Sequence, residues 1–166
     1  MLGSPALSLR LLAAGSGLML AMAAYFEHIL GLHPCTMCYW QRIPHWIAVI
    51  LGGISLIPAL PVVTPRHLLV LMALALLVGA GIAGWHSGVE LKILPGPTAC
   101  SGGMALDGDP SVLLDQLLAA PVVRCDEVPW SLFGLSMASW NGLISLAMAG
   151  AALASFLLSR RNRPQA

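Results

Sequence analysis

Charged side chains are scarce in this chain of 166 residues: Asp, Glu, Lys and Arg together make up 9%, against about 25% in an average soluble protein. Aromatic residues are also few, at 6%, whereas hydrophobic residues reach 58%. This hydrophobicity excludes intrinsic disorder. A net charge of +1 without a basic cluster excludes nucleic acid binding as a main role. The remaining class is a protein whose surface mostly faces membrane lipid.

Charge is absent from four long stretches, Leu11–Phe26, Ile43–Pro65, Leu68–Trp85 and Val128–Ser159. A bilayer core of roughly 30 Å needs about 20 helical residues to cross it. We therefore expect membrane-spanning helices at about 9–30, 43–61, 67–86 and 135–158. Strands are not expected, because lipid does not tolerate open sheet edges and a barrel would show alternating polarity. The expected fold is an all-α integral membrane protein, a four-transmembrane-helix bundle forming a single membrane domain over residues 1–166.

The first apolar stretch has a second interpretation, a cleaved signal peptide, because Ala21-Met22-Ala23 resembles a cleavage site. The apolar part of a signal peptide is usually about 7–15 residues long and follows several basic residues. Here the stretch is longer and only Arg10 precedes it. These features favour a retained helix.

The basic residues predict an orientation. One side of the membrane would hold both termini and five arginines, Arg10, Arg66, Arg160, Arg161 and Arg163. The other side would hold the segments 31–42 and 87–134 with Arg42, Lys92 and Arg124. Because Lys and Arg favour the cytoplasmic side, we expect both termini in the cytoplasm and the two segments outside it.

The longest connection, residues 87–134, is rich in Gly and Pro. Connections of this length are usually functional or disordered. Within it, Ser111–Ala120 has a serine in the N-cap position and leucines at helical spacing. Two interpretations are open, an amphipathic helix on the membrane surface and a helix packed on its own loop.

All four cysteines fall on the side expected outside the cytoplasm: Cys35, Cys38, Cys100 and Cys125. Structural free cysteines favour buried apolar sites, which these avoid. An even number of cysteines in such a compartment indicates disulfides, and four cysteines allow three pairings. The spacing favours Cys35 with Cys38, and Cys100 with Cys125.

Cys35 and Cys38 form a Cys-x-x-Cys pair where the second span is expected to start. Such a pair closes a very small ring, so its usual value is chemical: one thiol is activated and its neighbour resolves the product. The positive end of a helix dipole favours a thiolate at Cys38. Arg42 shares that helix face, where its charge would stabilise the thiolate or an anionic oxygen. Alternatively, Arg42 extends to the membrane boundary.

Metal and haem are the other common uses of paired cysteines. An oxidising compartment and the long separation of Cys100 from Cys125 disfavour a metal site. Covalent haem requires Cys-x-x-Cys-His, and Tyr39 occupies the histidine position. The chain has no flavin or nicotinamide motif. Two redox pairs then need another electron acceptor, and a lipid-soluble quinone would suffice.

Several short motifs follow one another along most of the chain: Pro34–Cys38 with Arg42, Trp85–Glu90, Gly96–Ser101, Cys125, Trp130 and Gly134–Trp140. In this order, with four spans among them, they resemble the DsbB family of bacterial disulfide bond formation proteins. The resemblance implies a four-helix bundle in the bacterial cytoplasmic (inner) membrane with its cysteines and the loops 31–42 and 87–134 in the periplasm. Such a protein reoxidises a periplasmic thioredoxin-fold oxidase of the DsbA type and passes the electrons to ubiquinone or menaquinone.

The resemblance also implies a role for each cysteine. Cys100 would form the mixed disulfide with the partner, and Cys125 would then attack Cys35. Cys38 would be left as the thiolate that faces the quinone.

Three further residues match family positions at the quinone. Arg42 would lie beside the Cys38 thiolate and the quinone. His86 matches a histidine at the outer end of the third span, and Met137 matches a residue that lines the quinone pocket. The alternatives are an interfacial histidine and a methionine that only packs.

The chain departs from the family at Gln41, where an acid is common. Glu27 and His28, near the outer end of the first span, would either be solvated at the interface or carry protons to a reduced quinone. Two other functions are considered. A vitamin K epoxide reductase-like thiol enzyme would place its paired cysteines late in the chain. A non-enzymatic soft-metal transporter or chaperone would use the cysteines as ligands and need no electron acceptor.

Overall fold

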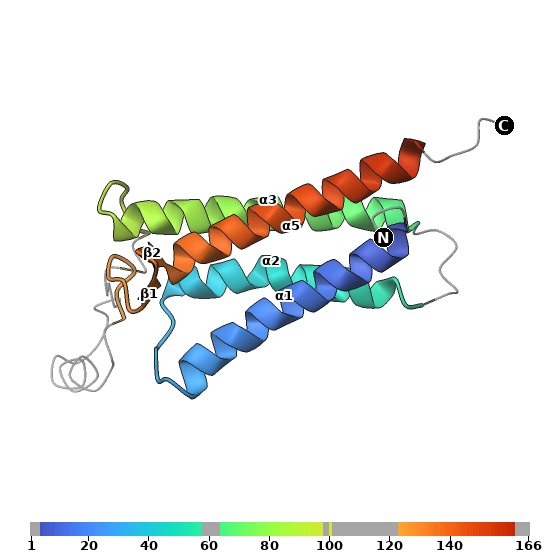
Figure 1. Cartoon of the computed structure of the whole chain (residues 1–166). Coiled ribbons are helices and arrows are strands. Elements are labelled where there is room, and N and C mark those ends of the chain that lie inside the picture. Colours follow the sequence, from blue (N-terminus) through green and yellow to red (C-terminus); the bar gives the residue numbers. More distant parts are fainter. Residues whose placement is uncertain (1–3, 58–63, 98–99, 101–122, 162–166) are drawn as a thin grey trace, which may run out of the picture.

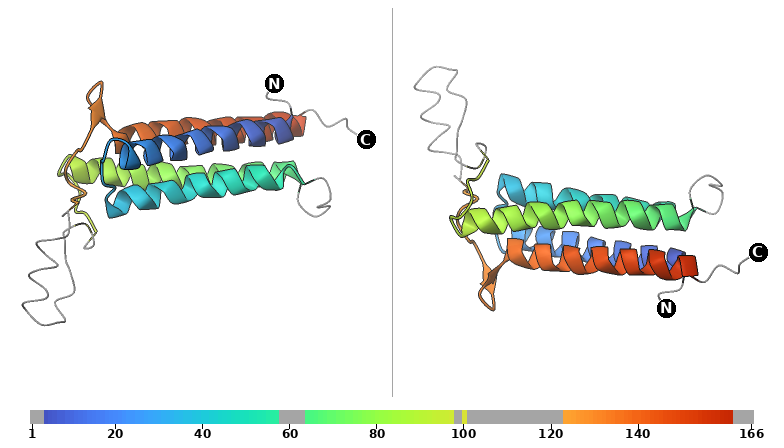
Figure 2. Two further views of the ribbon diagram at one scale, coloured as in Figure 1. Left: turned by 90° about the horizontal axis from the view of Figure 1, so that it is seen from below. Right: turned by 90° about the horizontal axis from the view of Figure 1, so that it is seen from above.

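The computed structural model describes residues 4–57, 64–97, 100 and 123–161. Four long helices run side by side (Figure 1): α1 Pro5–His28, α2 Thr36–Ile54, α3 Pro65–Glu90 and α5 Met137–Arg161. A short antiparallel hairpin precedes α5 and consists of β1 Ser131–Leu132 and β2 Leu135–Ser136. The start of α1 and the end of α5 lie at the same end of the bundle (Figure 2). The helix considered for 111–120 lies outside the described residues.

The helix boundaries differ from the expected spans because local capping sets them. α1 and α3 each begin at a proline, whose fixed φ suits the first helical position. α2 begins at Thr36, well before the expected 43–61, because the Cys35 sulfur caps its N-terminus. The cysteine pair and Arg42 are therefore already part of the first turns of α2. α5 begins at Met137 and not at 135, because Leu135 and Ser136 pair with β1.

The hairpin is a departure from the expectation that the chain has no strands. Phe133 and Gly134 join its strands with φ values of 53° and 78°, as in a two-residue hairpin loop of type I′. The indole N–H of Trp140 donates to the carbonyl oxygen of Leu132 at 3.1 Å. This bond fixes the hairpin against the first turn of α5. Each strand has only two residues, which is too short to produce a periodic pattern in the sequence.

Small residues bring the helices close together. α3 packs most extensively against α5, and α2 packs against both α1 and α3. A Cβ atom at Gly52 of α2 would lie 2.1 Å from the Cβ of Ala13 in α1. A Cβ atom at Gly142 of α5 would lie 3.3 Å from that of Ala83 in α3. Such close approach is typical of helices packed in membranes.

Large apolar side chains are exposed on the outer faces of all four helices, for example Leu18, Ile50, Leu74 and Leu157. Extensive exposed apolar surface marks contact with a membrane or a partner. Three helices, α1, α3 and α5, are long and apolar enough to cross a membrane. The all-helical membrane class is therefore confirmed, whereas the crossing of α2 stays a prediction because its polar residues lower its mean hydropathy.

Candidate active site

The thiol pair lies at the N-terminus of α2. The Cys35 and Cys38 sulfur atoms are 2.8 Å apart, and both residues are free thiols rather than the expected disulfide. Cys35 is 5% exposed. Its sulfur accepts the backbone N–H of Cys38 at 3.2 Å, which is the N-cap interaction of α2. The pair is thus a dithiol whose first sulfur is held by the helix end.

Cys35 carries the thiolate character of the pair. Its pKa is lowered to about 4, chiefly by the hydrogen bond from the Cys38 thiol and then by His86, while burial opposes the shift. The Nε2 atom of His86 lies 3.6 Å from the Cys35 sulfur. The sequence placed the thiolate at Cys38. In the dithiol, the sulfur that caps the helix and contacts His86 is that of Cys35, whereas the role of Cys38 as the thiolate that faces the quinone stays a prediction.

A disulfide joins Cys100 to Cys125, as the spacing indicated, with their Cα atoms 5.4 Å apart. Both cysteines are buried, and they belong to the same hydrophobic cluster as Cys35, Met37 and Val89. The second redox pair is therefore packed beside the first.

His86 is brought to the thiol pair by the last turns of α3 and is 3% exposed. Its Nδ1 lies 2.6 Å from Nε2 of Gln41, and its Nε2 lies 4.0 Å from a carboxylate oxygen of Glu90. Glu90 in turn accepts a hydrogen bond from the Ser136 hydroxyl. Glu90 was not singled out from the sequence as a site residue, although its position one turn after His86 places both on one helix face.

Arg42 pairs with Glu27 across α1 and α2. Its Nη1 lies 2.6 Å from Oε2 of Glu27, and the hydroxyl of Tyr39 donates to Oε1 of the same carboxylate at 3.1 Å. The guanidinium also lies over the Tyr39 ring, 4.9 Å from its centroid. Glu27 is therefore the partner of Arg42 at the rim of the site, a contact that sequence reasoning missed. His28 is exposed.

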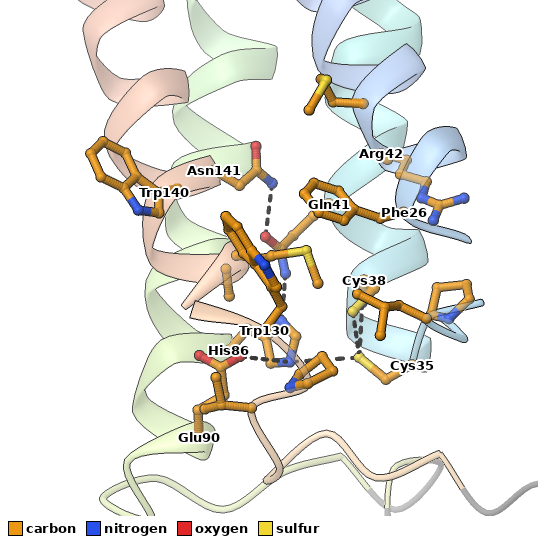
Figure 3. A pocket seen from close by; sticks show the side chains of 18 of the residues that line it. Phe26, Cys35, Cys38, Gln41, Arg42, His86, Glu90, Trp130, Trp140 and Asn141 are labelled. Carbon is orange, nitrogen blue, oxygen red and sulfur yellow. Dashed lines mark hydrogen bonds and ion pairs between the residues drawn. The ribbon is translucent and has the colours of Figure 1, made fainter. Parts of the chain in front are cut away.

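A cavity of about 630 Å³ opens beside the thiol pair and is bounded by all four helices, the hairpin and the segment that precedes the hairpin. The four residues expected at the quinone line it together, namely Cys38, Arg42, His86 and Met137, and Cys35 lines it as well. Figure 3 shows Cys35, Cys38, Arg42 and His86 between the helices, with Phe26, Trp130 and Trp140 on the apolar wall of the cavity. Mostly apolar walls with a few polar groups are typical of a small-molecule site of this volume.

The cavity has a second set of polar residues that the sequence analysis did not select. Gln41, His45 and Asn141 line it, and the first two are 4% and 3% exposed. Gln41 and His45 are four residues apart and share the inner face of α2 with buried Met37, Ala48 and Leu51. That spacing was a usable signal, whereas their contact with Asn141 of α5 was not visible in the sequence.

Cys35, Cys38 and His86 place their ligand atoms within 4.8 Å of one another. Structural zinc sites use four protein ligands. The four-cysteine site considered from the sequence is not formed, because Cys100 and Cys125 are bonded to each other. The arrangement is that of a redox pair with a neighbouring histidine.

Helices of membrane-spanning length, a pair of neighbouring thiols and an adjacent disulfide are the features of a membrane thiol–disulfide oxidoreductase. The model of the DsbB family, described as "Disulfide bond formation protein DsbB", matches residues 5–155. The chain therefore belongs to the DsbB family, as its motifs indicated.

Curated relatives agree with this assignment. The chain is 38% identical over 144 residues to "Disulfide bond formation protein B" of Saccharophagus degradans. This match covers 80% of this chain and 83% of the relative. It is 32% identical to the protein of that name from Stutzerimonas stutzeri, over 81% and 84% of the two chains. It is 33% identical to the one from Nitrosococcus oceani, over 80% and 84%. No solved structure matches the chain.

Proposed function

We propose that this chain is a protein-dithiol:quinone oxidoreductase that reoxidises a DsbA-like periplasmic thioredoxin-fold oxidase. One observation supports this above all. Cys35 and the disulfide Cys100–Cys125 belong to one buried cluster, against which Cys38 packs, and both thiols border an apolar cavity of about 630 Å³. Electrons can therefore enter at the disulfide, reach the dithiol by exchange, and leave through the cavity.

Entry begins when a thiolate of the partner attacks the Cys100 sulfur. The Cys100–Cys125 bond breaks, and Cys125 leaves as a thiolate that attacks Cys35 of the oxidised Cys35–Cys38 pair. Cys38 then leaves as a thiolate. Each step replaces one S–S bond by another, so electrons and sulfur bonds balance.

Release of the partner restores the loop disulfide. The second thiol of the partner attacks the mixed disulfide and frees Cys100, which attacks Cys125 and expels Cys35. The partner now holds a disulfide, and the reduced pair holds the two electrons, with Cys35 ionised and one proton on Cys38. This is the combination of dithiol and disulfide that the structure holds.

The cavity fits a quinone headgroup by the chemistry of its walls. A bound ubiquinone or menaquinone would supply the acceptor for two electrons and two protons, which reforms the Cys35–Cys38 bond. Phe26, Trp130 and Met137 offer apolar contact to a ring. Arg42 offers N–H donors to a carbonyl oxygen, and the hydrogen bonds from Cys38 and His86 keep Cys35 ionised.

We further infer that the protein lies in the bacterial inner membrane with four spans, α2 included, and with both termini in the cytoplasm. Arg10 donates to the carbonyl of Ser55 at the end of α2. Arg66 at the start of α3 donates to the carbonyl of Ser159 near the end of α5. These arginines gather at the end of the bundle opposite the cysteines, which supports a cytoplasmic location for that end.

The decisive experiment supplies the purified protein with a reduced DsbA-type protein and short-chain ubiquinone or menaquinone in separate reactions. We expect one quinone to be reduced for each partner disulfide formed, as followed by quinone absorbance and thiol counting. Cys100→Ser serves as the control and should stop both processes. Oxidation of the partner without quinone reduction, or equal rates in the Cys100→Ser variant, would refute the proposal.

A further inference from the structure

A continuous row of hydrogen-bonded polar side chains runs from the thiol pair into the apolar interior of the bundle. Figure 3 shows its first part, from Cys35 through His86 and Gln41 to Asn141. We call these five residues the polar row: Ser16, Gln41, His45, His86 and Asn141. Starting from Cys35, the successive contacts are 3.6 Å to His86, 2.6 Å to Gln41, 2.8 Å to Asn141, 2.8 Å to His45 and 3.3 Å to Ser16. All four helices contribute to it.

The polar row lies in the apolar interior of the bundle, where the burial of polar groups costs free energy. Burying an amide or an imidazole costs free energy unless each polar atom finds a partner. Among the described residues, every buried side-chain nitrogen and oxygen atom has one. Ionisable residues inside membrane helices usually have a functional reason, and the relay of cysteines does not by itself require His45 or Asn141.

One contact of Gln41 with a residue outside the polar row determines which groups donate and which accept along the row. Nε2 of Gln41 lies 3.4 Å from the backbone carbonyl oxygen of Met37, which can only accept. The amide nitrogen of Gln41 must therefore point toward Met37 and His86, and its oxygen toward Asn141. Asn141 then donates through Nδ2 to this oxygen at 2.8 Å.

The same direction continues to the far end of the row. With Nδ2 of Asn141 used for Gln41, its Oδ1 accepts from Nε2 of His45 at 2.8 Å and from the Ser145 hydroxyl at 3.3 Å. Nδ1 of His45 then accepts from the hydroxyl of Ser16. Every donor in the row thus points toward the thiol pair.

Gln41 donates to Nδ1 of His86, so this nitrogen carries no proton. The other ring nitrogen faces the Cys35 sulfur at 3.6 Å and a carboxylate oxygen of Glu90 at 4.0 Å. We propose that Gln41, held in place by Asn141 and His45, fixes His86 in the tautomer whose proton lies on Nε2. These three are positioning residues, because they act on the thiol only through His86.

This inference deepens the proposed function and rests on it for its meaning. Cys35 is the leaving sulfur when the loop disulfide is restored, and the sulfur that re-forms a bond to Cys38 when the electrons leave. A His86 that always presents Nε2–H to this sulfur donates a hydrogen bond that stabilises the thiolate in each of these steps. The opposite direction of the row would leave Nε2 without its proton and remove that donor.

The test reads the two nitrogen atoms of His86 directly. The full chain, labelled with ¹⁵N-histidine and reduced at Cys35 and Cys38, is placed in lipid nanodiscs, and its imidazole nitrogens are observed by NMR at neutral pH. The His86 signals are assigned by their loss in His86→Gln. We expect an unprotonated Nδ1 and a protonated Nε2. A protonated Nδ1 in the wild-type protein overturns the proposal.

Two variants and a control examine the positioning role. Gln41→Glu keeps the shape but offers only acceptors, so the Nδ1 signal should move to that of a protonated nitrogen. Asn141→Leu frees Gln41 to turn, so the single Nδ1 signal should become an average of both forms. Ser145→Ala removes a neighbouring hydroxyl outside the row and should leave the signals unchanged.

Wild-type Nδ1 signals in both Gln41→Glu and Asn141→Leu overturn the role of the row. If the Asn141→Leu variant does not fold, the Nδ1 signal of His86 in the isosteric Gln41→Glu variant decides whether the row has this positioning role. The measurement needs neither quinone nor partner protein, so its failure is distinct from failure of the proposed function.

Discussion

At the scale of single residues, the two thiols of the Cys-x-x-Cys pair are not equivalent. The Cys35 sulfur receives a backbone N–H, the thiol of Cys38 and the Nε2 atom of His86. A sulfur with several donors around it is stabilised as a thiolate. The dithiol therefore has one ionised sulfur that is ready to be oxidised and one that retains its proton.

The first prediction concerns the reactivity of Cys35. In the reduced protein, alkylation of Cys35 by iodoacetamide should titrate with a midpoint near pH 4, since its pKa is lowered to about 4. The rate should stay constant above this pH and fall below it, because only the thiolate reacts. Peptide mass spectrometry after acid quenching measures the rate at each pH. His86→Phe removes one donor and should raise the midpoint, and a wild-type midpoint above pH 7 would contradict the assignment.

The second prediction concerns Cys38. Cys38→Ser should still allow the mixed disulfide between Cys100 and the partner, because that step involves only the loop pair. Quinone reduction should stop, because the second electron-carrying sulfur is missing. Non-reducing gels report the mixed disulfide, and absorbance reports the quinone. Unchanged quinone turnover in this variant would show that Cys38 is not needed to pass electrons to the quinone.

The third prediction separates two roles of Arg42. Arg42→Met should raise the quinone KM roughly tenfold, as expected for the loss of one hydrogen bond from a charged donor, while the protein stays folded. Glu27→Gln is the matched control, since it breaks the ion pair at 2.6 Å and keeps the guanidinium in the cavity. Its KM should change much less. An equal change of the quinone KM in both variants would indicate that Arg42 acts only as the structural partner of Glu27.

At the scale of elements, the sequence predicted the helices well and their ends poorly. Runs of apolar residues determine which segments become helices in lipid. The ends depend on single contacts, such as the cap at Cys35 or the left-handed pair Phe133–Gly134, which hydropathy does not encode. The whole first turn of α2 was missed for this reason.

The candidate site was also predicted only in part, because motifs indicate its residues but not the side chains that they contact. Each cysteine, Arg42, His86 and Met137 was predicted from motifs as a site residue, and all of them except Cys100 and Cys125 line one cavity. The partners of these residues were not found, because they come from other helices. The contact of Arg42 with Glu27 and that of Gln41 with Asn141 depend on how helices pack, which one sequence does not reveal.

The fourth prediction tests the close packing of α1 and α2. Gly52→Ala should lower the melting temperature, because the added Cβ would lie 2.1 Å from the Cβ of Ala13. Overpacking of this kind costs about 1–3 kcal/mol. Gly53→Ala is the matched control, since a Cβ there meets nothing within 4 Å. Thermal unfolding in detergent, followed by circular dichroism, compares the two, and equal melting temperatures would argue against this helix contact.

At the scale of the whole molecule, the bundle has two chemically different ends. Arg10 and Arg66 bind backbone carbonyls at the end where α1 begins and α5 ends. The thiol pair, the disulfide and the cavity occupy the other end, where α2 begins and α3 ends. The proposed electron transfer from a soluble partner to a lipid-soluble carrier would suit this arrangement, because the partner would approach from water and the carrier from the bilayer.

The fifth prediction follows from this polarity. A membrane-impermeant maleimide added to intact spheroplasts should label Cys35 and Cys38 whenever they are reduced. Blocking the respiratory chain should increase this labelling, because electrons can no longer leave the dithiol. A cysteine at the other end, introduced by Arg161→Cys in a background without native cysteines, should be labelled only after the membrane is opened. Labelling of Arg161→Cys in intact spheroplasts would show that the orientation is the opposite of the predicted one. If the respiratory block left the labelling of the native thiols unchanged, the dithiol would not pass its electrons to the quinone pool.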